Sequence, residues 1–266
     1  MAVDPQHSQF LTLCDQAARA AGEVLRRWEG KFKVREKGRA DLVTEADLEA
    51  QNAIYDILMG PYPDFGFLGE EEGHSTRSPG DNPWHWIVDP LDGTTNYVHG
   101  LQNYCVSIAL AEGDRIVAGV VYDPVFDRSY QAVTGGGAFM NGERLQASGA
   151  ETLEQSLVAA SFAPSVTRDS QEIDDFVNVM VRSQGIRRLG SAALNLAFVA
   201  AGQLDAYWAG DIKPWDIAAG VLLVEEAGGL VRNYGNVPID WTRPQIVATA
   251  TEPLQAEMQG ILSPSY

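Results

Sequence analysis

The sequence has few cysteines and no long apolar run. Cys14 and Cys105 are its only cysteines among 266 residues, which excludes a disulfide framework and indicates a reducing compartment. No apolar stretch approaches the roughly 20 residues that span a bilayer, and the N-terminus lacks the basic start and apolar run of a signal peptide. We therefore expect a cytoplasmic protein with no membrane partner.

Basic residues are also scarce. Nineteen Lys and Arg face 36 Asp and Glu, so the formal net charge is -17. Such a surface repels nucleic acid, and we expect no nucleic-acid partner, although basic residues gather at Arg26-Arg27 and in 31–39. The hydrophobic share of 45% is typical of a globular enzyme. An anionic substrate would have to be attracted by bound cations.

The order of apolar patterns predicts a mixed α/β chain. Its first half reads as two helices followed by an antiparallel meander, and its second half alternates strands with helices. We expect a boundary near 148–156, giving an N-terminal unit of 1–150 that carries most of the site and a C-terminal unit of 151–266. The expected helices cover 5–28, a segment from residue 44, 173–183, 192–201 and 215–227; the expected strands cover 65–68, 86–88, 106–111, 116–122, 128–133, 157–161, 186–189, 205–208, 230–233 and 246–249.

Three acidic features lie where predicted elements begin or end. Glu70 and the segment Asp89-Pro90-Leu91-Asp92-Gly93-Thr94-Thr95 each follow a predicted strand, and Asp216 opens a predicted helix. Strand ends and helix starts hold catalytic side chains rigidly. Magnesium prefers carboxylate oxygens, waters and phosphate oxygens, and four carboxylates repel one another unless cations lie between them. The acidic residues are therefore candidate metal ligands.

The segment after Asp92 adds an anion-binding pattern. Gly93 lets the backbone approach a ligand, and Thr94 and Thr95 would offer hydroxyls and N–H groups at a helix start. Together these features indicate metal-assisted phosphoryl transfer. Each also has a simpler interpretation: a solvated turn at Glu70, a helix cap at Asp216, and a plain turn at 89–93. An EF-hand fails on its third and fifth positions, and the Asp spacing is wrong for a phosphoaspartyl enzyme.

Longer segments resemble the signature blocks of the inositol monophosphatase family. The resemblance covers about residues 8–250. Its blocks are Asp41-Leu42-Val43-Thr44-Glu45-Ala46-Asp47, Gly69-Glu70-Glu71, Trp86–His99, Gly137–Gly142, Trp215-Asp216-Ile217-Ala218-Ala219-Gly220 and Glu226-Ala227-Gly228-Gly229.

The resemblance implies a layered α/β/α/β/α sandwich with mixed sheets, usually a homodimer, with two or three Mg²⁺ ions and competition by Li⁺. The implied chemistry is attack by a metal-activated water without a phosphoenzyme. Catalysis would involve Glu70, Thr94 and Asp47. The implied metal ligands are Glu70, Asp89, the Leu91 carbonyl, Asp92 and Asp216, and the implied substrate contacts are Asp92, Gly93, Thr94, Thr95, Gly190, Ser191, Ala192, Lys213 and Asp216.

The substrate is less well defined. The continuation Thr95-Asn96-Tyr97-Val98-His99 resembles the inositol-type subgroup, but Ala209 stands where those members usually carry a sugar-contacting Glu. Asp211 lies two residues later, and Lys213 is a candidate contact for a second phosphate. We predict a Mg²⁺-dependent phosphomonoesterase for a small phosphorylated polyol, with inositol monophosphate first. The alternatives are histidinol phosphate, fructose 1,6-bisphosphate or a 3′-phosphoadenosine nucleotide as substrate, and a non-catalytic interaction protein that reuses the fold.

Overall fold

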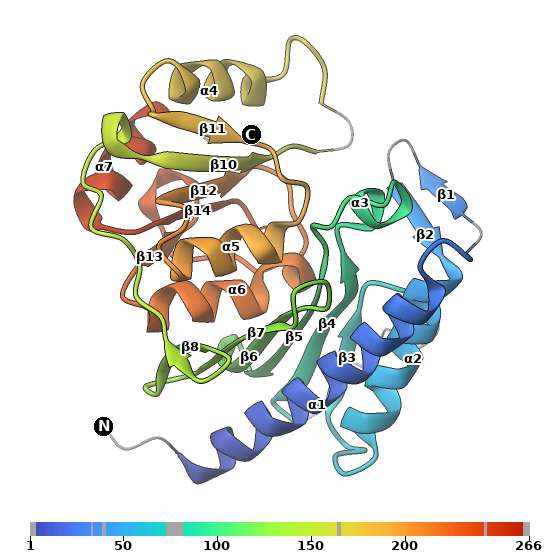
Figure 1. The fold of residues 1–266 in the computed structure, drawn as a ribbon. Coiled ribbons are helices and arrows are strands. Elements are labelled where there is room, and N and C mark those ends of the chain that lie inside the picture. Colours follow the sequence, from blue (N-terminus) through green and yellow to red (C-terminus); the bar gives the residue numbers. More distant parts are fainter. Residues whose placement is uncertain are drawn as a thin grey trace.

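The computed structural model describes residues 4–32, 34–38, 41–72, 82–163, 166–241 and 244–262. Two β-sheets alternate with three layers of helices, which confirms the predicted α/β/α/β/α sandwich (Figure 1). Within the described residues, no helix is both long and apolar enough to cross a membrane.

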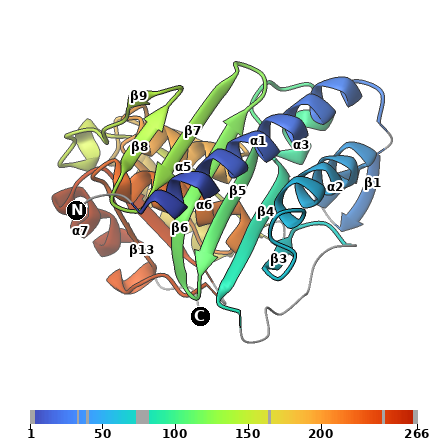
Figure 2. The ribbon, with the colours of Figure 1, turned by 90° about the horizontal axis from the view of Figure 1, so that it is seen from below.

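The first layer consists of α1 (Pro5–Trp28) and α2 (Glu45–Met59), which cover one face of the larger sheet (Figure 2). The Asp4 carboxylate caps α1 by accepting the Gln6 N–H at 2.9 Å, as the Asp-Pro start predicts. The apolar pattern of the sequence predicts that Leu48, Ile54, Ile57 and Leu58 form the buried face of α2. This prediction needs a correction, because Leu48 is 36% exposed. The buried residues of this helix recur every four positions, so Leu48 lies on another face: they include Ala46, Ala50, Ile54 and Leu58.

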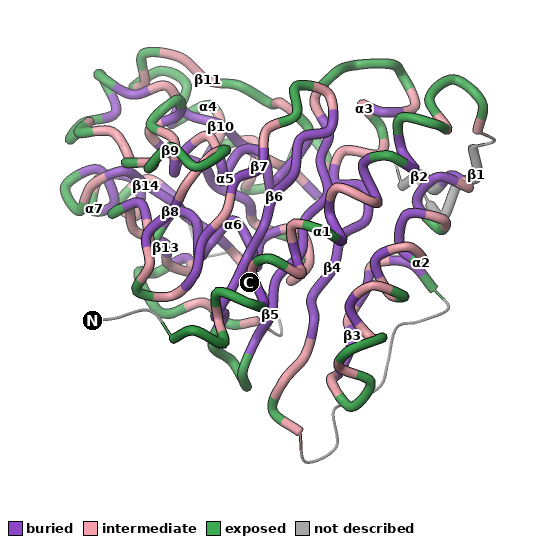
Figure 3. Tube along the Cα trace, turned by 60° about the horizontal axis from the view of Figure 1, so that its bottom comes forward, coloured by how far each residue is buried: buried purple, intermediate pink, exposed green. Residues whose placement is uncertain are grey.

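The larger sheet has seven strands in the order β3-β4-β5-β6-β7-β8-β9. Only the β3–β4 pair is parallel, and the predicted meander of β5, β6 and β7 is confirmed. Figure 3 shows that its central strands are buried along most of their length, since helices cover both faces. The strands are β3 (Gly66–Gly69), β4 (Trp84–Asp92), β5 (Cys105–Glu112), β6 (Arg115–Asp123), β7 (Arg128–Val133), β8 (Gly137–Met140) and β9 (Glu143–Arg144); a hairpin of β1 (Val34–Gly38) and β2 (Asp41–Thr44) precedes α2.

The middle layer consists of α5 (Ala192–Ala200) and α6 (Pro214–Glu226), and the short α3 (Thr94–Val98) follows β4. α5 and residues 217–224 of α6 are mostly apolar and buried on nearly every side, as expected for helices between two sheets. One hydrophobic cluster joins residues of both sheets to these helices, from Ile87 to Ala248. The two halves of the chain therefore share a core.

The second sheet has five strands in the order β11-β10-β12-β14-β13. Two helices lie on its outer side (Figure 1): α4 (Gln171–Met180) and α7 (Glu252–Ile261). The last element predicted from the sequence is the strand of 246–249, so α7 was not predicted, although Thr251 is an N-cap and Pro253 follows in the first turn. The strands are β10 (Leu157–Ser161), β11 (Gly185–Arg187), β12 (Ala206–Ala209), β13 (Leu230–Arg232) and β14 (Ile246–Thr249).

Candidate active site

Residues 89–92 form the end of β4 and are not a turn that follows the strand. The strand predicted over 86–88 is therefore longer than expected and covers Trp84–Asp92. Asp89 pairs with Ser107 and Asp92 with Cys105, so two residues of β4 oppose a single residue of β5. This is a β-bulge, and it contains Pro90, which has no N–H for the ladder. The Leu91 N–H donates to Asp89 Oδ1 at 2.9 Å. The bulge lets one strand present two carboxylates three residues apart.

Two other elements bring carboxylates to this end of the sheet. β3 lies parallel to β4, and the N–H of Glu70 donates to the Val88 carbonyl at 3.1 Å, which places Glu70 beside Asp89. Asp216 lies in the first turn of α6, where its Oδ2 accepts the Lys213 N–H at 2.9 Å. The structure thus brings together the four predicted carboxylates, Glu70, Asp89, Asp92 and Asp216, which we call the acidic cluster.

Burial and mutual repulsion make this cluster electrostatically unusual. Asp89 is 2% exposed. Its pKa is raised well above the ordinary value, first by burial and then by the charges of Glu70, Asp92 and Asp216. Burial, followed by repulsion from Asp92, raises the pKa of Asp216 to about 7, and burial raises the pKa of Asp92. Buried carboxylates favour either a proton or a bound cation.

The donor set fits a hard cation such as Mg²⁺. All four side chains offer oxygen, which Mg²⁺ prefers, and none of the ion pairs found among the described residues involves Asp89, Asp92 or Asp216. In the same part of the chain, no group of three or more His, Cys, Asp or Glu side chains is arranged to hold a metal ion. Mg²⁺ usually retains several waters and binds substrate oxygens through only one or two carboxylates, so it does not need such a group.

Hydrogen bonds from the second half of the chain fix Asp92. Its Oδ2 accepts the Ser191 hydroxyl at 2.6 Å and the Ala193 N–H at 2.7 Å, and the Cys105 thiol lies 3.7 Å away. Ser191 also caps α5 through the Leu194 N–H. Sequence reasoning gave Cys105 no role, because only the pairing of β5 with β4 reveals its position.

The predicted Thr94–Asp47 pair is present. The Thr94 hydroxyl lies 3.4 Å from Asp47 Oδ1 and 3.1 Å from the Leu91 carbonyl oxygen. Asp47 closes a capping box at the start of α2, where its Oδ2 accepts the N–H and the hydroxyl of Thr44 at 2.9 and 2.5 Å. Burial, opposed by these bonds, raises the pKa of Asp47 to about 6. Asp47 is therefore held in place and directed at Thr94.

Two glycines let the halves of the site meet. Gly93 has φ +98°, and a Cβ there would lie 3.0 Å from the Asn103 carbonyl oxygen. Gly190 has φ +83°, and its Cβ would lie 2.9 Å from the Asn96 amide. The Asn96 amide donates to the carbonyls of Asn103 and Leu189 at 2.7 and 2.8 Å, and the Asn103 amide donates to Leu189 at 3.0 Å. These two amides escaped sequence reasoning, although Asn96 lies within a recognised block.

A cleft of about 560 Å³ opens above the acidic cluster. Six predicted residues line it: Glu70, Asp92, Gly190, Ala192, Lys213 and Asp216. The structure adds Ser161, Phe162, Arg188, Asp211, Ile212 and Trp215. The remaining predicted residues lie outside the lining, and among them Ser191 is fully buried whereas Thr95 is exposed.

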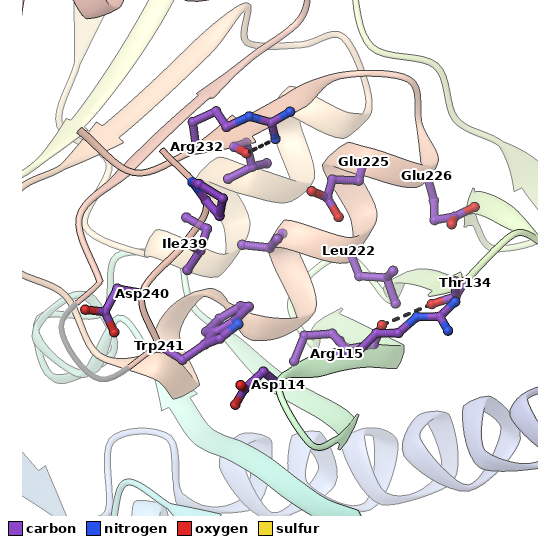
Figure 4. Close-up of a pocket in the computed structure, with 14 residues that line it drawn as sticks. Asp114, Arg115, Thr134, Leu222, Glu225, Glu226, Arg232, Ile239, Asp240 and Trp241 are labelled. Atoms are coloured by element: carbon purple, nitrogen blue, oxygen red, sulfur yellow. Dashed lines mark hydrogen bonds between the residues drawn. The ribbon is translucent and has the colours of Figure 1, made fainter. Parts of the chain in front are cut away.

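A second cavity, of about 510 Å³, lies at the other end of α6 (Figure 4). Leu222, Glu225 and Glu226 line it from α6, facing Arg232 and Trp241. The Glu226 carboxylate accepts the N–H groups of Gly135 and Gly137 at 2.6 and 2.7 Å. None of the predicted site residues lines this cavity.

Comparison with known proteins supports the chemistry of the cleft. A sequence model described as the inositol monophosphatase family matches residues 6–264. An inositol-1-monophosphatase of Mesorhizobium japonicum is 44% identical, over 84% of this chain and 85% of that protein. A protein of Pseudomonas aeruginosa called Nus factor SuhB is 41% identical, over 85% of each chain.

Solved structures agree. The extragenic suppressor protein suhB of Bartonella henselae superposes with a TM-score of 0.90 at 38% identity, over 97% of this chain and 100% of that one. An inositol monophosphatase from Anabaena gives 0.86 at 35% identity, over 97% of each. The prediction of an enzyme of the phosphoric monoester hydrolase class is confirmed by these similarities. The chain belongs to the inositol monophosphatase family.

Proposed function

We propose that this protein is a Mg²⁺-dependent phosphomonoesterase that hydrolyses a small phosphorylated polyol by attack of water, without a phosphoenzyme. The observation that carries the proposal is the acidic cluster. Burial raises the pKa of three of its carboxylates, Asp89, Asp92 and Asp216, and no ion pair found in the described residues neutralises them. The charges of the other acids in the cluster raise the pKa of Asp89 further. Such a cluster is suited to bind cations that in turn bind phosphate.

In this proposal the acidic cluster and the Leu91 carbonyl hold two or three Mg²⁺ ions. When bound, Mg²⁺ supplies positive charge to the phosphoryl oxygens and favours ionisation of the attacking water. The rigidity of the carboxylates comes from the protein, since Asp92 is fixed by Ser191 and Ala193. Preorganised charge of this kind is usually the largest contribution to catalysis.

Thr94 and Asp47 position the water and accept its proton. The Thr94 hydroxyl can donate to Asp47 Oδ1 or to the Leu91 carbonyl oxygen, and in either case its lone pairs can accept a hydrogen bond from water. Glu70 lies at the end of β3, on the side of Asp89, and takes part as a second acceptor. The N–H groups in the first turn of α3, after Gly93, have no partner within that helix and are available to phosphate oxygens.

The proposal also covers the oligomeric state, the two subdomains and the substrate. We infer a homodimer from the family resemblance, which analytical ultracentrifugation would test. We also propose that 1–150 and 151–266 act as two subdomains over one core, since the first sheet ends at Arg144 and the second begins at Leu157. The third is the substrate: inositol monophosphate comes first, because several relatives are named for it.

The test is phosphate release from a panel of monoesters, measured with EDTA, with Mg²⁺, and with Mg²⁺ plus Li⁺. The panel contains inositol 1-phosphate, histidinol phosphate, fructose 1,6-bisphosphate and 3′-phosphoadenosine 5′-phosphate. We expect release from a polyol phosphate only with Mg²⁺, and inhibition by Li⁺. No Mg²⁺-dependent release from any member would refute the proposal and favour a non-catalytic role.

A further inference from the structure

Three charged side chains stand at the exposed edge of the cleft, apart from the acidic cluster. Arg188, Asp211 and Lys213 all line the cleft and are all exposed. We call them the rim residues. Two of the three are cationic, in a chain whose net charge is -17. A pair of cations at the mouth of the cleft is therefore unusual in this protein.

Arg188 is held by aromatic packing. It follows β11, and its guanidinium carbon lies 5.6 Å from the centre of the Phe162 ring. Phe162, which also lines the cleft, packs edge-on against Phe176 of α4 at 5.4 Å. An arginine stacked on a ring keeps the N–H groups at its edge free to bind an anion through two parallel hydrogen bonds.

Neither rim cation is neutralised by an ion pair in the described part of the chain. The Lys213 N–H bonds to Asp216, while its ammonium group extends from an exposed residue at the start of α6. Asp211 supplies one negative charge against two positive ones. The three rim residues together thus carry a net positive charge. A substrate whose distal group is a neutral alcohol would not neutralise this charge.

The sugar-contacting carboxylate implied by the family resemblance is missing from its expected position. Ala209 stands there, at the end of β12, where it is completely buried and lies outside the lining of the cleft. Asp211, two residues later, is the one carboxylate among the rim residues, and it shares the rim with two cations. Charge at the rim therefore favours an anion over a polyol hydroxyl.

We propose that the substrate carries a second anionic group, a phosphate or a carboxylate, at the end away from the phosphate that is cleaved, and that Arg188 and Lys213 bind it. This inference rests on the proposed phosphatase function and narrows its substrate class. Arg188 supplies a planar fork of donors and Lys213 a compact charge. A polyol monophosphate whose far end carries only neutral hydroxyls, such as inositol monophosphate, is then a weaker substrate than a counterpart with a second anionic group at that end.

The test uses three phosphate esters of one six-carbon chain: glucitol 6-phosphate, 6-phosphogluconate and glucitol 1,6-bisphosphate. They differ only at the distal carbon, which carries an alcohol, a carboxylate or a phosphate. Initial rates of phosphate release with Mg²⁺ give kcat/KM for each. We expect kcat/KM for the better of the two esters with a distal anion to exceed that for glucitol 6-phosphate, whose distal group is a neutral alcohol, by about tenfold or more. A charged hydrogen-bond pair is worth about that factor.

Variants assign the preference to the rim. Arg188→Gln should lower kcat/KM about tenfold for the preferred ester with a distal anion and leave that for glucitol 6-phosphate within about twofold. Lys213→Gln should lower the ratio of these two kcat/KM values by a similar factor; the ratio is the readout because the charge of Lys213 also acts on Asp216. Asp211→Asn should act in the opposite direction. Arg187→Gln is the matched control, because Arg187 is an exposed neighbour outside the cleft.

The outcomes separate this inference from the proposed function. Phosphate release at similar kcat/KM from all three esters would overturn the inference alone. So would an equal loss for all three esters in Arg188→Gln and Lys213→Gln, since the rim would then serve the cleaved phosphate or the fold. Release from none of the esters would argue against the phosphatase function and the inference with it.

Discussion

α6 has a cavity at each end, and the two are similar in size and in the charged residues that line them but differ in how their acidic residues are placed. The cleft at its N-terminus has a volume of about 560 Å³ and the cavity at its C-terminus about 510 Å³. At the first, the charge of buried Asp92 raises the pKa of Asp216 further, beyond the effect of burial. At the second, Glu226 accepts two N–H groups, and the charge of Arg232 opposes the rise that burial causes in the pKa of Glu225.

The placement of the acidic residues, and not the cavity volume, indicates which of the two cavities is reactive. A carboxylate such as Glu226, whose two oxygens each accept an N–H, contributes to stability, whereas several carboxylates buried beside one another are available to a cation. We therefore assign reactivity to the N-terminal cavity and a structural role to the acids of the C-terminal one. Four predictions test this comparison.

The largest effect is expected for Asp92→Asn. The amide retains the shape of the side chain but removes a negative charge from the acidic cluster, so Mg²⁺ binding and phosphate stabilisation both weaken. A loss of several kcal/mol corresponds to a fall of about 10³-fold in kcat/KM. Steady-state phosphate release measures the loss, and circular dichroism checks the fold. Activity near that of the unchanged protein would move the reaction away from this cleft.

Thr94→Val should lower kcat by about 10²-fold, the range expected when a proton-transfer partner is lost. The substitution keeps the branched shape and removes the hydroxyl that faces Asp47. Thr94→Ser restores the hydroxyl and should recover most of the rate. A serine variant as slow as the valine variant would show that the methyl group, and not the hydroxyl, matters.

Removing Mg²⁺ should matter more for stability at high pH. The folded-state pKa values of Asp47 and Asp216 are raised from 3.8 to about 6 and about 7. Their contribution to stability in the metal-free protein is full below the ordinary Asp pKa and is lost as pH rises through these values. Mg²⁺ should therefore raise the Tm by several °C at pH 8 and by little at pH 5.

Thermal scans in EDTA and in Mg²⁺ at pH 5, 6, 7 and 8 measure this increment. Asp92→Asn is the matched variant, since it removes one of the repelling charges and should flatten the dependence. An increment that does not vary with pH would contradict the picture of a cluster stabilised by cations.

The smallest effect on activity is expected at the other end of α6. Glu226→Gln weakens the two bonds from Gly135 and Gly137, which should cost about 1 kcal/mol of stability and leave kcat/KM unchanged. Urea unfolding and phosphate release provide the two readouts. A strong loss of activity without loss of stability would show that the second cavity takes part in the reaction.

Much of this site could be predicted from local sequence. Thr44 and Asp47 form the capping box that their spacing indicates, and Glu70 and Asp216 lie at the strand end and helix start where they were expected. Spacing is informative here because caps and strand ends depend on neighbours within a few residues.

What escaped prediction depends on contacts between distant residues. Cys105 reaches Asp92 only because β5 pairs with β4. Asn96 and Asn103 gain their role from the Leu189 carbonyl, which comes from the other half of the chain. The bulge at Pro90 required the partner strand to be known. No periodicity in a single segment carries such information.

The Leu189 carbonyl, bound by two amides, has a consequence for substrate choice. It anchors the residue next to Arg188 to the segment that follows Gly93. The regions that bind the two ends of a substrate would therefore be held at a fixed distance. That distance sets the separation between the cleaved phosphate and the distal anion. A chain shorter or longer by one carbon would satisfy only one end, so the enzyme would select its substrate by length as well as by charge.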